Sequence, residues 1–150
     1  MAPGFAIICV VLHIEIPPCL MDEITSHARR AYPEECCGMV LRRQGPREHW
    51  TRVMPFKNHE AEPCKAYRID PFELLGFQKK VRSCGEEIGV IYHSHPDAPA
   101  WFSAKDEAVA CPKGRPANPE RAHLVLSVVN GEVAGQELYR WDPLRRKYEA

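Results

Sequence analysis

The sequence lacks the features that mark several other classes of protein. Its 150 residues include 20 basic and 20 acidic side chains, so no excess of charge favours nucleic acid or an anionic membrane as a partner. The most apolar run, Phe5 to Leu12, is too short to span a bilayer and follows no positively charged segment, which disfavours a membrane helix and a signal peptide. No Cys-x-x-Cys pair occurs, and the cysteines number seven, an odd count; both facts disfavour a zinc ribbon and a secreted disulfide scaffold.

The length and the composition of the chain are typical of one globular domain. A chain of 150 residues that is 45% hydrophobic can bury a single core. We therefore expect one domain over residues 1–150, in which the first residues, to about residue 8, are either a loose extension or an artefact of the chosen start site. Most cysteines are expected to be reduced and buried, as in a cytoplasmic protein. The pattern assigns no role to Cys36, Cys37, Cys64 or Cys111.

Hydrophobic periodicity and turn residues predict short helices and strands mixed along the chain. Helices are expected over Pro18–Ala31, from Pro71 to near Cys84-Gly85, and from Ser103 to about Ala110. Strands are expected over Val10–Ile16, Cys36–Arg42, His49–Phe56, Ala66–Ile69, Glu87–Tyr92, His123–Val129, Glu132–Trp141 and Lys147–Glu149. Because helices and strands do not alternate strictly, the fold class is α/β (α+β) with a mixed, largely antiparallel sheet.

Particular turn residues support these boundaries. Asp70 is expected to cap the helix that begins at Pro71, with Glu73 completing a capping box, and Gly85 is expected to end that helix. Asn130-Gly131 predicts a two-residue hairpin turn between two strands.

The segment His93-Ser94-His95-Pro96 lies at the end of an expected strand. Side chains alternate along a strand, so His93 and His95 point to one face and Ser94 to the other. Asp106, on the first turn of the next helix, can supply a third ligand, and three protein ligands are typical of a catalytic zinc site. Two alternatives need no metal: the histidines can be structural, and Ser103-x-x-Asp106 is a capping box in its own right.

A catalytic zinc site also needs a general base. Glu34 and Glu35 precede the apolar strand that starts at Cys36, where a carboxylate could accept a proton from water. Acidic pairs at such places are also common as solvated turn residues, and the residues alone do not choose between the two. Trp101 and Phe102, in the loop before the third helix, either line a substrate channel or pack that loop.

Taken together, these residues resemble the JAMM (MPN+) metalloproteases. The signature of that family is a Glu, then His-Ser/Thr-His-Pro, then a Ser eight residues after the second His and an Asp three residues later, and this chain matches every spacing from His93 onward. The resemblance implies a three-layer α/β/α fold, a Zn²⁺ ion held by His93, His95 and Asp106, and an oxyanion donor at Ser103. The family's Glu stands three residues before a Gly, which selects Glu35, three before Gly38, as the base.

The resemblance also implies a substrate. Family members cleave bonds after the C-terminal tail of ubiquitin or ubiquitin-like proteins, and small bacterial members are associated with sulfur-carrier proteins of the ubiquitin fold. We therefore expect hydrolysis after a Gly-Gly-type tail, with no nucleic-acid or membrane partner. Two alternatives stay open: a non-catalytic MPN-type scaffold, and a zinc hydrolase of a small molecule. Two histidines and an aspartate also suit several divalent ions other than zinc.

Overall fold

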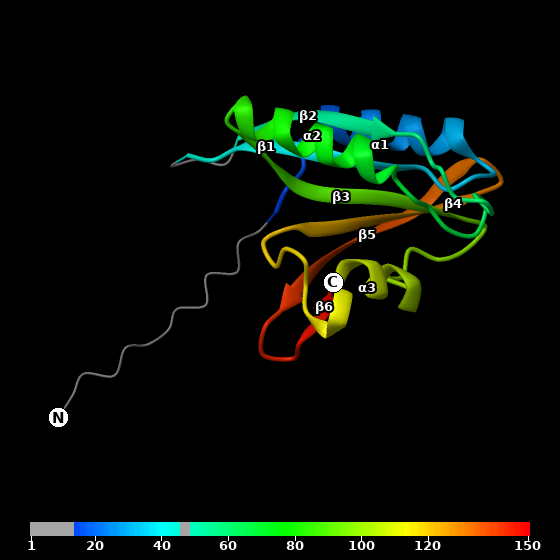
Figure 1. The fold of residues 1–150 in the computed structure, drawn as a ribbon. Coiled ribbons are helices and arrows are strands. Elements are labelled where there is room, and N and C mark those ends of the chain that lie inside the picture. Colours follow the sequence, from blue (N-terminus) through cyan, green and yellow to red (C-terminus); the bar gives the residue numbers. More distant parts are fainter. Residues whose placement is uncertain (1–13, 46–48) are drawn as a thin grey trace.

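The computed structural model describes residues 14–45 and 49–150 (Figure 1). In chain order the elements are α1 (Pro18–Ala31), β1 (Cys37–Arg43), β2 (His49–Phe56), α2 (Pro71–Ser83), β3 (Glu86–Pro96), α3 (Ala104–Ala110), a 3₁₀ turn (Pro112–Gly114), β4 (Ala122–Val129), β5 (Glu132–Asp142) and β6 (Lys147–Glu149). Within these ranges, no helix combines the length and the apolar character needed to cross a membrane.

The strands form one six-stranded sheet in the order β2-β1-β3-β4-β5-β6. Among the described strands, β3 and β4 pair in parallel and the other neighbours pair antiparallel. Helix α1 lies behind this sheet in Figure 1, and α2 and α3 lie in front of it. The predicted three-layer α/β/α fold with a mixed, largely antiparallel sheet is therefore confirmed.

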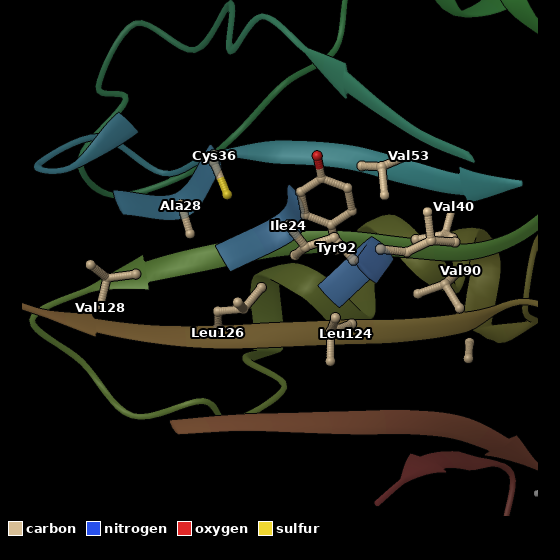
Figure 2. Packing of buried hydrophobic residues seen from close by; sticks show 12 residues of the cluster. Ile24, Ala28, Cys36, Val40, Val53, Val90, Tyr92, Leu124, Leu126 and Val128 are labelled. Carbon is tan, nitrogen blue, oxygen red and sulfur yellow. The ribbon is translucent and has the colours of Figure 1, made fainter. Parts of the chain in front are cut away.

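The core behind the sheet is formed by α1 and the strand residues that face it. Leu20, Ile24 and Ala28 recur every four residues on α1 and are buried, as is typical of the apolar face of an amphipathic helix. They pack in one cluster with Tyr92 of β3, which Figure 2 shows near Ile24 and Val53. The Tyr92 hydroxyl lies 2.8 Å from Nδ1 of His27, so this buried phenol has a polar partner.

The core in front of the sheet is formed by α2. The buried residues of this core come from β1, β2, α2 and β3. They are Cys37, Met39, Leu41, Phe56, Val81 and Ile88. As predicted, the helix begins at Pro71 behind an Asp70 cap, whose carboxylate accepts from the N–H groups of Phe72 and Glu73. The expected capping box is only half formed, because the Glu73 carboxylate lies 3.8 Å from His59 Nε2 instead. Gly85 follows the helix with φ of +69°.

Three expectations about strands and cysteines need correction. Residues 14–16 of the expected strand Val10–Ile16 have no strand structure, and its other residues lie outside the described part of the chain. Ala66–Ile69 forms no strand, because the side chain of Asn58, in the same loop, binds its backbone. The expected burial of most cysteines is wrong, since Cys36 and Cys37 are the two buried thiols among the six described ones, all of which are free.

Candidate metal centre

Strand β3 carries both histidines of the candidate site, and it runs further than predicted, to Pro96. His93 pairs with Cys37 of β1 and with Val125 of β4, so its side chain lies on the α2 side of the sheet, as that of Cys37 does. Ser94 faces the opposite side, where its hydroxyl accepts a 2.8 Å hydrogen bond from the N–H of Cys36. The predicted alternation of side chains is confirmed.

The two histidines and Asp106 converge on one point. His93 Nε2 lies 3.1 Å from His95 Nε2 and 3.1 Å from Asp106 Oδ1, and His95 Nε2 lies 3.4 Å from Asp106 Oδ2. All three residues are buried. Tetrahedral zinc ligands at roughly 2.0–2.1 Å from the ion lie about 3.3 Å from one another, which is close to these separations. The donor atoms therefore suit a small divalent ion.

Helix α3 presents Asp106 to the histidines through its N-terminal cap. Ser103 Oγ accepts from the N–H of Asp106, and Asp106 Oδ2 accepts from the N–H of Ser103 at 2.8 Å and from its hydroxyl at 2.6 Å. The capping box and the histidine contacts thus exist together. Because the cap is made with Oδ2, the second carboxylate oxygen, Oδ1, stays directed at His93.

The loop after β3 orients His95. Its Nδ1 lies 2.9 Å from the carbonyl of Pro99, an acceptor, so Nδ1 carries the proton and the lone pair of Nε2 faces Asp106. That loop is held in turn by the hydroxyl of Ser127, which donates to Ala98 O at 2.7 Å, and by that of Tyr139, which donates to Ala100 O at 2.8 Å. Backbone anchoring thus sets the tautomer that a metal ligand needs.

The ring of His93 is held by stacking. Tyr67, from the loop between β2 and α2, stacks on it with ring centroids 4.8 Å apart and 29° between the ring planes. Nδ1 of His93 is buried and has no hydrogen-bond partner among the described residues. Sequence reasoning did not identify Tyr67, because no local pattern shows that its loop folds back over β3.

The charge states of His93 and Asp106 suit metal binding. Burial lowers the pKa of His93, which keeps this imidazole neutral. Burial alone would raise the pKa of Asp106, but hydrogen bonds with His93 and His95 outweigh it and hold the pKa well below its usual range. A neutral imidazole and an ionised carboxylate are the forms that ligate zinc.

Glu35 and Glu34 lie in different environments. Glu35 is only 7% exposed and lines a cavity of about 820 Å³ together with His95 and Asp106, whereas Glu34 is exposed. Cys37, the first residue of β1, pairs antiparallel with His93. If this register is extended by two residues before β1, Glu35 lies opposite His95. Burial raises the pKa of Glu35 to about 7, and the nearby Asp106 carboxylate adds to the rise.

The cavity is bounded by two further segments. The loop between β2 and α2 supplies Cys64 and Tyr67, and the segment around α3 supplies Ser103 and Val109. Trp101 also lines the cavity and is 59% exposed. Phe102 instead packs against three aromatic rings of β4, β5 and β6, those of His123, Tyr139 and Tyr148. Of the two aromatic residues weighed as channel lining, Trp101 therefore borders the cavity and Phe102 packs the loop.

Three curated proteins are similar to part of this chain. Desampylase of Haloferax volcanii is 37% identical over 57% of this chain and 63% of its own. A probable TtuB-protein conjugate cleaving protease of Thermus thermophilus is 37% identical over 63% of this chain and 62% of its own. CysO-cysteine peptidase of Mycobacterium tuberculosis is 34% identical over 61% of both. The chain thus spans a little under two thirds of the length of these relatives.

Solved structures and a family profile extend the likeness to most of the chain. A solution structure from Desulfitobacterium hafniense has a TM-score of 0.61 at 32% identity, covering 81% of this chain and 78% of its own. Another, from Salinibacter ruber, has a TM-score of 0.64 at 25% identity, covering 91% and 87%. The profile of the prokaryotic homologs of the JAB domain matches residues 17–142, from the start of α1 to the end of β5. This chain therefore belongs to the prokaryotic JAB (JAMM/MPN) family.

Proposed function

We propose that this protein is a zinc-dependent metallopeptidase or isopeptidase that hydrolyses the bond after the Gly-Gly-type tail of a ubiquitin-like or sulfur-carrier protein. The observation that carries the proposal is the convergence of His93, His95 and Asp106, two of which, His95 and Asp106, line a cavity together with the buried Glu35. Three buried ligands beside a carboxylate whose pKa is near neutrality suit hydrolysis more than they suit a purely structural site.

His93 and His95 would bind the ion through Nε2, and Asp106 would bind it through Oδ1, the oxygen that the helix cap leaves free. When bound, zinc supplies a Lewis acid that polarises a carbonyl and acidifies water. The Pro99 carbonyl would keep His95 in the ligating tautomer during turnover. Two histidines and an aspartate also suit other divalent ions, so the experiment must identify which metal the protein binds.

Glu35 would act as the general base and then as the general acid. A carboxyl group whose pKa is near 7 can accept a proton from the attacking water and return it to the departing nitrogen at neutral pH. Its position on the cavity wall that it shares with His95 supports this role. Glu34 is exposed and has no such position.

Ser103 would stabilise the oxyanion. Its hydroxyl now donates to Asp106 Oδ2, but the N–H of Ser103 holds the same oxygen independently. The hydroxyl can therefore turn toward a substrate oxygen without releasing the carboxylate. Removing one such donor typically costs a factor of about 10² to 10³ in rate.

The names of the relatives support the substrate class. One relative is called a desampylase, another a protease that cleaves TtuB-protein conjugates, and a third a CysO-cysteine peptidase. We propose a substrate of the same kind, with an extended tail that enters the cavity beside Glu35. An extended chain in such a site would be held mainly by hydrogen bonds to its backbone.

The test is cleavage of a sulfur-carrier protein of the ubiquitin fold that bears a peptide after its C-terminal Gly-Gly, followed by mass spectrometry. We expect the zinc-loaded protein to hydrolyse the bond that follows the second Gly and so to release the peptide. Glu35→Gln and His95→Ala should abolish release, whereas Glu34→Gln, the matched control, should cleave like the wild type. Full cleavage by Glu35→Gln or His95→Ala would refute the assignment.

Metal analysis separates the enzyme from a scaffold of the same fold. The proposal expects one zinc per chain in the wild type and a much weaker affinity in Asp106→Ala. A wild-type chain that fails to bind zinc or any other divalent ion would contradict the proposal.

A further inference from the structure

The wall of the cavity opposite α3 is a loop without regular secondary structure. It comprises residues 57–70, between β2 and α2. Six of its side chains line the cavity: Glu60, Glu62, Cys64, Lys65, Ala66 and Tyr67. A segment without a hydrogen-bonded ladder needs other partners for its backbone polar groups.

A single side chain, that of Asn58, supplies many of those partners. Its Oδ1 accepts from the N–H of Glu60 at 2.9 Å and from the N–H of Arg68 at 3.1 Å. Its Nδ2 lies 3.0 Å from the carbonyl of Ala66 and 3.4 Å from that of Pro63. Asn58 therefore joins the two ends of the loop to its middle.

The same amide also reaches the candidate base. Nδ2 of Asn58 donates to the main-chain carbonyl of Glu35 at 3.1 Å. The N–H of Glu35 donates to the carbonyl of Pro63 at 2.7 Å, and Pro63 is itself within reach of Asn58. The loop thus binds both the N–H and the carbonyl of Glu35, which lies two residues before the start of β1.

We propose that Asn58 is a positioning residue that holds the backbone of Glu35 and the cavity wall of residues 57–70 as one unit. This inference rests on the proposed function, because it gives Glu35 the role of the base. Asn58 acts through other residues: it is not among the residues that line the cavity.

The consequence of losing Asn58 follows from these contacts. Without its N–H donors, the carbonyls of Glu35 and Ala66 lose a partner. Ala66 adjoins Tyr67, whose ring stacks on His93. The base and the wall would therefore shift together, and a misplacement of about 1 Å in a reacting group can cost about 10²-fold in rate. The three candidate metal ligands come from β3 and α3, and none of them bonds to Asn58.

The experiment compares Asn58→Asp with the matched control Asn118→Asp. Both asparagines accept a hydrogen bond from the N–H two residues later, but Asn118 lies in the segment before β4, outside the loop of residues 57–70. Asp keeps the shape and the acceptor oxygen and loses both N–H donors. The measurements are kcat and KM on the extended sulfur-carrier protein, zinc affinity by competition with a chelator, and the thermal unfolding midpoint.

We expect Asn58→Asp to lower kcat about 10- to 100-fold while zinc affinity stays at the wild-type value, and Asn118→Asp to change neither. If Asn58→Asp does not fold, Asn58→Ala, which adds no charge, takes its place. In a Glu35→Asp background, whose base is already displaced, the further loss from Asn58→Asp should be smaller than in the wild type.

Two results would overturn the inference: an unchanged kcat in Asn58→Asp, or a loss of kcat that is matched by a parallel loss of zinc affinity. Failure of the proposed function gives a different result, since either the wild type would then release no peptide or Glu35→Gln would cleave at the wild-type rate.

Discussion

Ser94 and Cys36 are joined by two hydrogen bonds at the point where β1 meets β3. The N–H of Ser94 donates to the carbonyl of Cys36 at 3.1 Å, and the N–H of Cys36 donates to the hydroxyl of Ser94 at 2.8 Å. In the second bond a side chain takes the place of a strand carbonyl. The residue between the two candidate zinc ligands therefore fixes the segment that carries Glu35.

Ser94→Ala should destabilise the protein by about 1–3 kcal/mol. Both residues are almost fully buried, so the N–H of Cys36 would lose its partner without access to water. Ser94→Thr retains a hydroxyl and should recover most of this loss. Urea unfolding of the two variants checks the prediction, and equal stability of Ser94→Ala and wild type would contradict it.

Gly38 and Tyr92 approach each other too closely for any other residue at position 38. They pair across β1 and β3, and a Cβ on Gly38 would lie 2.3 Å from atoms of the Tyr92 ring, which is buried against α1. Gly38→Ala should therefore cost about 1–3 kcal/mol or more through overpacking.

Gly76→Ala is the control for this substitution. Gly76 lies inside α2, and a Cβ there meets no atom within 4 Å. Because alanine favours a helix over glycine by about 0.5–1 kcal/mol, this variant should be as stable as the wild type or more so. Thermal unfolding of both variants measures the contrast, and a Gly38→Ala protein with the wild-type midpoint would show that the ring moves aside freely.

The sequence could predict the parts of the site that depend on local pattern. Alternation along β3 places His93 and His95 on one face, and the capping box places Asp106 at the start of α3. The choice of Glu35 over Glu34 depends on the family resemblance and its offset from Gly38, and the structure explains that glycine, since a Cβ at position 38 would meet Tyr92.

The parts that depend on a long loop could not be predicted. Ala66–Ile69 has the composition of a strand, but Asn58 binds its backbone in place of a neighbouring strand. Tyr67 reaches His93 only because of that arrangement. Long-range contacts made by one irregular segment leave no periodic signal in the chain.

Glu35 should lower the stability of the metal-free protein at neutral and higher pH. Burial raises its folded-state pKa from 4.5 to about 7, so the folded state holds a proton that the unfolded state releases. For a carboxyl with a raised pKa, stability is lost as pH rises from about 4.5 to about 7. The loss is at most about 3 kcal/mol, and solvent screening reduces it.

Glu35→Gln removes this charge. In chelator-treated protein it should be more stable than the wild type at pH 8 and similar to it at pH 4, where both states of Glu35 are protonated. Unfolding by urea at the two pH values measures the difference. Equal stability of the two proteins at pH 8 would mean that the carboxylate is well solvated.

His123 should make the protein sensitive to acid. It is buried on β4 in contact with Phe102 and Tyr148, and burial lowers its pKa to about 4, from 6.5. The folded state therefore keeps His123 neutral while the unfolded state takes up a proton below about pH 6.5. Stability should fall as pH drops from about 6.5 to about 4, by about 3 kcal/mol for this residue.

His123→Phe separates this effect from acid denaturation in general. The phenylalanine ring can occupy the same place between Phe102 and Tyr148, and it cannot bind a proton. Relative to the wild type, the variant should therefore gain stability progressively between pH 6.5 and pH 4, with a constant difference above pH 7.5 that reports packing alone. Parallel stability curves for the two proteins across this range would show that His123 is protonated in the folded state as readily as in the unfolded chain.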